Sequence, residues 1–214
     1  MIVAVDGPAA SGKGTIARAI ARHYHLPHLD TGLLYRAVGM AVLREGGDPA
    51  DPVQALAACR FADATLADET LKSEAAGKAA SMVSVHPAVR AALLDRQRGF
   101  ARTPGGAVLD GRDIGTVIAP GADAKLFVTA SAEIRAERRF RELQVMGLAV
   151  TLPHVLADIR ARDERDSGRS TAPLRMASDA QLLDTSALSV DAAVAAAIAL
   201  IAGAGLQPAN DRAS

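Results

Sequence analysis

The chain has few of the residues on which several classes of protein depend. It contains no tryptophan, 3% aromatic residues and a single cysteine. So few aromatic side chains make poor stacking platforms for single-stranded nucleic acid. The lone Cys59 cannot form an intramolecular disulfide or a Cys/His metal cluster, which favours a reducing compartment.

An excess of charge of one sign and a long apolar run are also missing. Lys plus Arg equal Asp plus Glu at 24 each, so no global positive field exists to hold nucleic acid or an anionic membrane. The longest apolar stretch, residues 192–206, is mostly alanine and too short to span a bilayer. No secretion signal precedes the first apolar run, and no heptad pattern predicts a coiled coil. We therefore expect a cytoplasmic monomer that binds neither a nucleic-acid polymer nor a membrane.

What the chain does contain is typical of an α/β domain. Apolar residues make up 50% and charged residues 22%, which is ordinary globular usage. Short apolar runs predict strands at residues 2–5, 107–109, 126–128 and 181–183. Longer periodic segments predict helices at residues 13–24, 33–44, 52–60, 87–101, 132–146, 151–166 and 190–202. This alternation predicts a mainly parallel sheet between helices, with ligands at the carboxyl ends of the strands.

Two segments interrupt the alternation. Residues 46–80 are opened by glycines and prolines and contain only a weak strand candidate at residues 65–67, so they are interpreted as an irregular, inserted subdomain. Further along, Gly147 breaks a helical pattern and predicts a short hinge or flap.

The segment after the first predicted strand has the pattern of a phosphate-binding loop and opens a predicted helix. It runs Gly7-Pro8-Ala9-Ala10-Ser11-Gly12-Lys13. Its glycines allow backbone N–H groups to converge on phosphate oxygens, and the helix N-terminus adds a positive dipole end. Lys13 would reach the β- and γ-phosphates. A glycine-rich turn without a ligand is the alternative.

The residues after Lys13 depart from the general loop pattern, which has Ser or Thr directly after the lysine. Here Gly14 precedes Thr15, and Gly14 has no hydroxyl to bind magnesium. We therefore expect the metal to be held mainly by nucleotide phosphates and water. The Lys-Gly-Thr order also resembles nucleoside monophosphate kinases.

Residues 107–113 end a predicted buried strand with two carboxylates and one guanidinium. Asp110 follows three apolar residues, at the place where phosphate-loop proteins use an acidic residue to organise hydrated magnesium. Arg112 and Asp113 would point elsewhere. The alternative is an Asp/Arg ion pair that caps a turn.

Three arginines and an aspartate share one predicted helix face. They follow helical offsets of 0, 3, 4 and 7: Arg162, Arg165, Asp166 and Arg169. Such a face suits phosphoryl transfer between two polyanions, which needs several cations. A solvated helix with an Arg162/Asp166 pair is the alternative. Arg36 lies one turn into its predicted helix. Taken without the other motifs, it would be interpreted as a solvent-exposed helix charge rather than a ligand-binding residue.

Taken together, four motifs resemble the bacterial cytidylate kinase family over nearly the whole chain. They occupy residues 7–15 (GPAASGKGT), 29–36 (LDTGLLYR), 110–116 (DGRDIGT) and 162–169 (RDERDSGR). The resemblance implies a P-loop NTPase core with a five-stranded sheet, and Mg²⁺-assisted transfer of a phosphoryl group from ATP to CMP or dCMP. It also implies a monophosphate-binding insertion at about residues 31–100, a lid at about 138–156 and a loose tail at 204–214.

The resemblance also implies roles for individual residues. ATP would be bound by Gly7, Pro8, Ala9, Ala10, Ser11, Gly12, Lys13, Gly14 and Thr15. CMP would be bound by Thr31, Tyr35, Arg36, Ser81, Arg90, Arg112, Asp113, Arg162 and Asp166, with magnesium near Asp110. The catalytic cations would be Lys13, Arg112, Arg138, Arg139, Arg165 and Arg169. A carboxylate at Asp113 can accept from the amino group of cytosine, whereas uracil presents a carbonyl there.

In the family that this chain resembles, a longer, strand-rich segment usually precedes the helix that carries Ser81. Residues 71–74 replace that segment here. This shortening leaves the size and the closing motion of the insertion open. Other kinases on the same core, such as a shikimate-type or a broad uridylate/cytidylate kinase, also remain open. So does a nucleotide-dependent switch without turnover, although no Asn-Lys-x-Asp guanine motif occurs.

Overall fold

A computed structural model of the chain describes residues 1–203 and 205. The chain divides into two compact units, which are described separately. The first unit contains residues 1–29 and the chain from residue 101 onward, and the second contains residues 30–100. Apart from Gly205, the predicted tail at 204–214 lies outside the described residues.

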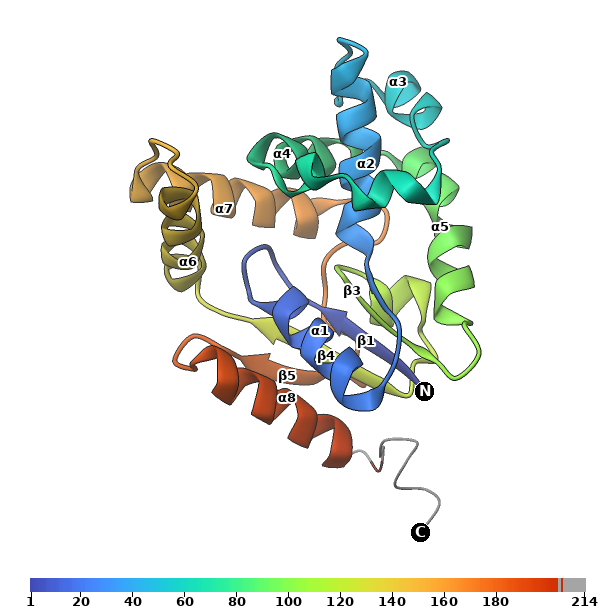
Figure 1. The fold of residues 1–214 in the computed structure, drawn as a ribbon, viewed down its shortest axis with the longest axis vertical. Coiled ribbons are helices and arrows are strands. Elements are labelled where there is room, and N and C mark those ends of the chain that lie inside the picture. The colour runs from blue at the N-terminus through green and yellow to red at the C-terminus, as the bar shows by residue number, and fades with distance from the viewer. Residues whose placement is uncertain (204, 206–214) are drawn as a thin grey trace. The chain divides into compact units, whose positions relative to one another are not determined.

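The first unit contains a five-stranded sheet in the order β2-β3-β1-β4-β5 (Figure 1). Its strands are β1 (Ile2–Asp6), β2 (His28–Asp30), β3 (Ala107–Gly111), β4 (Ala124–Thr129) and β5 (Gln181–Asp184). The pairs β1–β3, β1–β4 and β4–β5 are parallel. The predicted mainly parallel sheet is therefore confirmed, and each predicted strand extends by one to three residues in total. Strand β2 was not among the four strands predicted from apolar runs, because the sequence pattern indicated only its carboxyl end.

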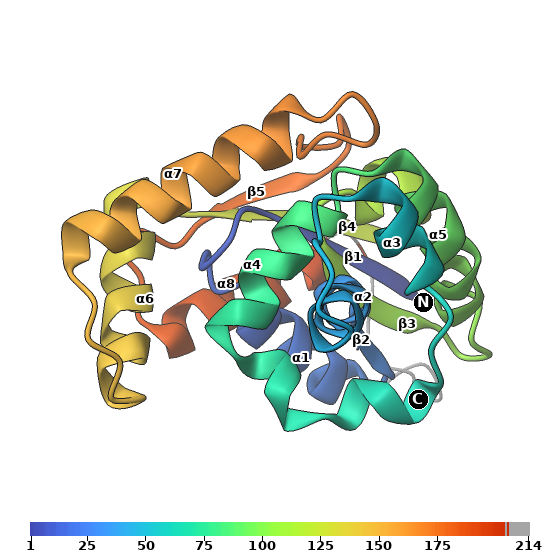
Figure 2. The same cartoon turned by 90° about the horizontal axis from the view of Figure 1, so that it is seen from above.

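Two helices cover one face of this sheet, α1 (Lys13–Tyr24) and α8 (Val190–Gly203) (Figures 1 and 2). Val3 and Val5, alternate residues of β1, are fully buried in the same apolar cluster as Ile20 of α1 and Ile201 of α8. Burial of such aliphatic side chains supplies most of the favourable free energy of folding. The core is therefore aliphatic, as the scarcity of aromatic residues requires.

Helices α6 (Ala132–Val145) and α7 (Leu152–Gly168) pack against each other in the first unit. The chain between them turns at Gly147, whose φ of +75° is in the left-handed region that favours glycine. The predicted break at Gly147 is confirmed. Along the described chain, no helix is long and apolar enough to cross a membrane.

The second unit is helical and has its own apolar core. Its elements are α2 (Thr31–Arg44), α3 (Pro52–Ala57), the 3₁₀ turns η1 (Asp63–Ala67) and η2 (Glu69–Lys72), α4 (Glu74–Val83) and α5 (Pro87–Ala101). Leu34, Val38, Val83 and Leu93 are almost completely buried in its core. The unit therefore has the apolar interior that holds its own shape.

Two expectations for this unit are wrong. The strand candidate at residues 65–67 is part of the 3₁₀ turn η1, and the segment 46–80 is not irregular throughout, because α4 begins at Glu74. The hydroxyl of Ser73 caps α4 by accepting from the N–H of Ala76 at 3.2 Å. The buried positions of α4 are small residues such as Ala76, Gly77 and Ala79, which keep a helical period.

Helices α2 and α4 approach closely at Gly39. A Cβ atom placed on Gly39 would lie 2.6 Å from the Cβ of Ala79 and 2.8 Å from the carbonyl carbon of that residue. Real side chains do not pack at such distances, so glycine is required for this helix crossing.

Asp6, at the carboxyl end of β1, anchors the segment that follows β3. Its two carboxylate oxygens accept from the N–H groups of Ile114 and Gly115, both at 2.8 Å. These residues begin the π-helical turn η3 (Ile114–Ile118). Burial raises the pKa of Asp6 to about 6, against the two backbone hydrogen bonds, which lower it, and with the nearby carboxylate of Asp113, which adds to the rise.

We predict opposite effects for two glycine-to-alanine substitutions in helices of the second unit. Gly39→Ala should lower the free energy of unfolding by about 1–3 kcal/mol, because the new methyl group overlaps Ala79. In the control Gly99→Ala, the Cβ atom meets nothing within 4 Å, so higher helix propensity should raise stability by up to about 1 kcal/mol. Urea denaturation measures both, and equal effects would contradict the close approach.

Asp6 predicts a pH dependence of stability. Its pKa is about 6 in the folded chain and about 4 in the unfolded chain, so the native state binds more protons between these values. The contribution of Asp6 to the free energy of unfolding is therefore fully present below about pH 4. It falls by about 3 kcal/mol as the pH rises through 6. Urea denaturation from pH 4 to 7 should show this loss in the wild type relative to Asp6→Asn. A difference that does not change with pH would contradict it.

Candidate functional site

The predicted phosphate-binding loop connects β1 to α1 and lies tightly against β4. A Cβ atom on Gly7 would lie 2.0 Å from the carbonyl oxygen of Val128, so only glycine allows this approach. Ala10 and Gly12 both have left-handed backbone conformations, with φ of +58° and +87°. For Ala10 this conformation is costly, so surrounding contacts must hold the loop in shape.

The loop ends at the N-terminus of α1, which carries no side-chain cap within the described chain. Gly12 is the N-cap residue, and its carbonyl accepts from Thr15 and Ile16 at 3.1 Å. Lys13 reaches back across the loop, with its ammonium group 3.2 Å from the carbonyl of Pro8. Backbone N–H groups, a helix dipole and one cation thus combine as an anion site requires.

Asp110 lies beside the start of α1 and is almost fully buried. A Cβ atom on Gly14 would lie 3.7 Å from its Oδ2 atom, so the strand carboxylate and the loop are adjacent. Its Oδ1 atom is 2.7 Å from Nε2 of His28, at the start of β2. No role was predicted for His28, because a partner 82 residues away in the chain leaves no local sequence pattern.

Four of the predicted residues meet in one cluster around a buried carboxylate. Its members, called the Asp166 cluster below, are Arg112, Arg162, Asp166 and Arg169. Arg112 donates from Nε to Oδ2 of Asp166 at 2.8 Å. Arg169 donates from Nε to the backbone carbonyl of Asp166 at 3.2 Å. Three guanidinium groups are thus concentrated in the first unit.

The electrostatics of this cluster keep its carboxylate ionised. Burial by itself would raise the pKa of Asp166, but the charges of Arg112, Arg162 and Arg169 and the Arg112 hydrogen bond hold it below its usual range. Asp166 therefore stays negative at neutral pH and orders the arginines before any nucleotide binds.

The geometry corrects one detail predicted for this cluster and one detail of the alternative, the Arg162/Asp166 pair. Arg169 does not continue the arginine face, because α7 ends at Gly168 and Arg169 has an extended backbone. It turns back to Asp166 through its side chain instead. The carboxylate of Asp166 is hydrogen-bonded to Arg112 of the β3 end rather than serving only as an Arg162 pair on α7.

The other predicted cations of α6 and α7 have different surroundings. Arg138 donates to Oγ1 and to the carbonyl of Thr185, at 2.9 and 2.6 Å. Oγ1 of Thr185 in turn lies 3.1 Å from the carbonyl of Ser11 in the phosphate-binding loop. Arg139 pairs with Glu142 at 3.1 Å, and Arg165 is exposed on α7. Arg138 thus belongs to the surroundings of the loop.

The second unit holds five of the predicted CMP-binding residues. The guanidinium of Arg90 lies 5.5 Å from the ring centre of Tyr35, and Arg90 also donates to the carbonyl of Ser84. Arg36 donates to the carbonyls of Leu71 and Ser73, at 2.8 and 3.3 Å. The shortened segment therefore orients Arg36. The remaining two residues, Thr31 and Ser81, are buried.

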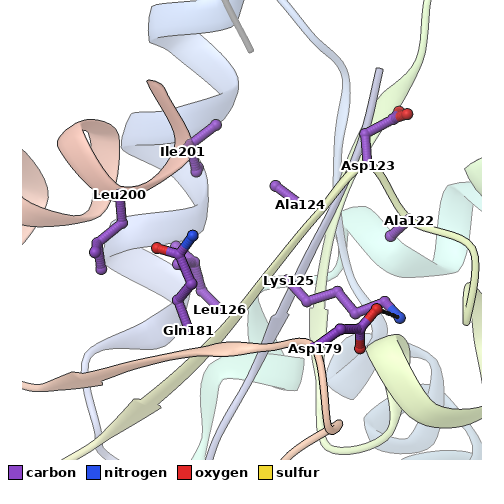
Figure 3. A pocket seen from close by; sticks show the side chains of 9 residues that line it. All are labelled: Ala122, Asp123, Ala124, Lys125, Leu126, Asp179, Gln181, Leu200 and Ile201. Atoms are coloured by element: carbon purple, nitrogen blue, oxygen red, sulfur yellow. Dashed lines mark hydrogen bonds and ion pairs between the residues drawn. The ribbon is translucent and has the colours of Figure 1, made fainter. Parts of the chain in front are cut away.

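A small pocket lies at the opposite ends of the strands, near the starts of β4 and β5 (Figure 3). In it the buried ammonium group of Lys125 donates to Asp179 at 2.6 Å, and this hydrogen bond lowers the pKa of Asp179. The pocket is separate from the phosphate-binding loop, which follows the carboxyl end of β1. Parallel α/β sheets bind ligands at the carboxyl ends of their strands, so this pocket is not the candidate site.

The chain is similar in sequence to known proteins along almost its whole length. The family model described as cytidylate kinase matches residues 3–203. A cytidylate kinase of Xanthobacter autotrophicus is 61% identical over 202 residues, which cover 94% of this chain and 97% of the relative. A cytidylate kinase of Rhodospirillum rubrum is 56% identical over 207 residues, which cover 94% of this chain and 97% of that relative.

The fold alone is also found in a more distant structure. A crystal structure of an uncharacterized protein from Eubacterium ventriosum has a TM-score of 0.55 at 15% identity, covering 94% of this chain and 98% of that one. From the family match and the high identity of these relatives along almost their whole length, the chain belongs to the cytidylate kinase family.

Proposed function

We propose that the chain transfers the γ-phosphoryl group of ATP to CMP and dCMP, giving ADP with CDP or dCDP. The observation that carries this proposal is the Asp166 cluster, whose three guanidinium groups occur in the same unit as the phosphate-binding loop. Transfer between two polyanions needs this concentration of cations, because electrostatic stabilisation does most of the catalytic work. Membership of the cytidylate kinase family supports the same reaction.

The chemistry is an in-line displacement. A phosphate oxygen of CMP attacks the γ-phosphorus of ATP, the bond to the β–γ bridging oxygen breaks, and ADP leaves with that oxygen. Lys13 and the arginines would neutralise charge on the transferred group. No side-chain nucleophile or general base is needed, because the attacking phosphate oxygen is already anionic near neutral pH.

The donor and acceptor would be held by different residues. The backbone of residues 7–15 would bind the phosphates of ATP. Thr31, Tyr35 and Arg36 would bind the CMP phosphate together with Arg112, while Arg162 and Asp166 would contact the ribose. Ser81, Arg90 and Asp113 would bind the cytosine edge.

Magnesium fits this site only with help from the nucleotide. Across the described residues, no group of three or more His, Cys, Asp or Glu side chains could hold a metal ion. Asp110 is the carboxylate beside the loop, and it would bind the ion through water while ATP phosphates supply direct ligands. The ion would neutralise part of the charge on the ATP phosphates.

The lid at residues 138–156, the monomeric state and the cytoplasmic location stay predictions. The turn between α6 and α7 exposes apolar side chains, among them Val145 and Met146. Closure of this turn over bound nucleotides would exclude water and suppress hydrolysis of ATP.

The first experiment measures ADP release with ATP and magnesium across CMP, dCMP, UMP, AMP and shikimate. We expect turnover with CMP and dCMP, and at least a hundredfold loss, on the order of one missing oxyanion contact, in Lys13→Ala. Lys72→Ala is the matched control, because Lys72 is exposed and pairs with Glu69 on the surface. Preference for another acceptor would overturn the proposed substrate. Tight ATP binding without turnover would indicate a nucleotide-dependent switch.

A second experiment tests the role of Asp113, which is 5% exposed. Asp113→Ala should reduce the preference for CMP over UMP by about 1–3 kcal/mol, the value of one base contact. Asp113→Asn should also raise turnover of UMP, because an amide N–H can donate to the uracil carbonyl. The ratio of kcat/KM for the two substrates measures both effects, with Asp191→Ala, at an exposed position of α8, as control. An unchanged ratio would remove Asp113 from base recognition.

A further inference from the structure

A buried arginine outside the predicted set of site residues connects the phosphate-binding loop to α7. Arg135 lies on α6 and is 5% exposed. It donates to the carbonyl of Ala9 at 3.2 Å and to the carbonyl of Ala130 at 2.9 Å. It also donates to both carboxylate oxygens of Asp163 on α7, at 3.0 and 2.6 Å. One guanidinium thus makes four hydrogen bonds to three segments of the chain.

We propose that Arg135 is a positioning residue for phosphoryl transfer. Its hydrogen bonds hold the phosphate-binding loop and the arginine-bearing helix α7 at a fixed distance and angle to each other. This inference rests on the proposed function. Arg135 would not contact the substrate. It would act by holding Ala9 of the loop and Asp163 of α7 in place.

The contact with Ala9 fixes the direction of a loop N–H group. A peptide group is planar and trans, so the carbonyl of Ala9 and the N–H of Ala10 point in opposite directions. When Arg135 holds the carbonyl, the N–H of Ala10 is turned to the other side, away from that guanidinium. Ala10 is also the residue whose φ of +58° needs support from its surroundings.

Apolar packing makes the same connection independently. The side chain of Ala10 packs against a cluster formed by Ala136 and Leu143 of α6 with Val155 and Ile159 of α7. The loop therefore touches the helix pair twice, through a methyl group and through the Arg135 guanidinium.

The contact with Asp163 extends this order to the Asp166 cluster. Asp163 directly follows Arg162 on α7 and precedes Asp166 by less than one helical turn. A bidentate guanidinium–carboxylate pair fixes both distance and angle, which a lysine cannot do. A shift of α7 relative to the loop would therefore move the arginines away from the γ-phosphoryl group.

The same two helices provide a matched control. Arg160 of α7 pairs with Glu133 of α6 at 2.8 Å, and both side chains are more than half exposed. This pair links α6 to α7 as the Arg135–Asp163 pair does, but it does not touch the loop. Exposed pairs contribute little to stability.

The test compares Arg135→Lys, Asp163→Asn and Arg160→Gln with the wild type by steady-state kinetics with ATP and CMP. We expect Arg135→Lys to lower kcat about 10- to 100-fold, the cost of a reacting geometry displaced by about 1 Å. The KM for CMP should change less than kcat does, because most of the residues proposed to bind CMP, among them Tyr35 and Arg36, lie in the second unit and not on α7. Arg160→Gln should stay within about twofold of the wild type.

Two further measurements separate positioning from general stability. Calorimetric titration with ADP should show weaker binding to Arg135→Lys than to Arg160→Gln, since ADP binding reports the loop without any chemistry. The double variant Arg135→Lys/Asp163→Asn should lose no more kcat than Arg135→Lys, because both changes break one connection. Where Arg135→Lys fails to fold, Asp163→Asn still tests the link, since the Ala9 and Ala130 contacts of Arg135 are kept.

Equal losses in Arg135→Lys and Arg160→Gln would overturn the proposal, because the pair would then only hold two helices together. Unchanged kcat and ADP affinity in Arg135→Lys and Asp163→Asn would overturn it as well. Wild-type turnover of CMP in the same assay separates these results from a failure of the proposed function. The ADP titration tests Arg135 even with a different acceptor.

Discussion

Mutual repulsion among guanidinium groups is the constraint that the candidate site has to satisfy before any nucleotide arrives. Arg112, Arg162 and Arg169 carry like charges and approach one another in a largely buried place, where water screens them poorly. Asp166 resolves this conflict by supplying the counter-charge, and its pKa stays low because the arginines surround it. The arginines are therefore ordered in advance, and an anionic group that binds beside them would meet charges that need little rearrangement.

The loop that would hold the donor depends on supports from several strands and helices. Asp6 fixes the turn after β3, the backbone of β4 touches Gly7, and Thr185 after β5 lies against the carbonyl of Ser11. These supports come from buried strand ends, so the rigidity of the sheet extends to the loop. A loop with left-handed residues could not keep its shape by local propensity alone.

The sequence predicted those features that local patterns encode. Apolar runs identified four strands, and a contiguous glycine-rich motif identified the loop. Side-chain pairs between distant segments were not predictable: Arg112 and Asp166 are 54 residues apart, and His28 and Asp110 are 82 apart. Only the folded sheet brings such residues together. Helix α4 entered only through the family resemblance, because the glycines and prolines that open residues 46–80 led to an irregular interpretation, although the small buried residues of α4 keep a helical period. The roles of individual residues toward nucleotides stay predictions.

The place where the second unit joins the sheet has a consequence for variation within the family. Residues 30–100 leave after β2 and return before β3, and these two strands are neighbours in the sheet. The closure entropy of such an excursion changes by only about 0.6 kcal/mol for each doubling of its length. Because residues 30–100 also have their own apolar core, segments can be lost from them without cost to the strand order or the phosphate-binding loop. Evolution can thus change the length of residues 30–100 while the sheet and the phosphate-binding loop are inherited unchanged.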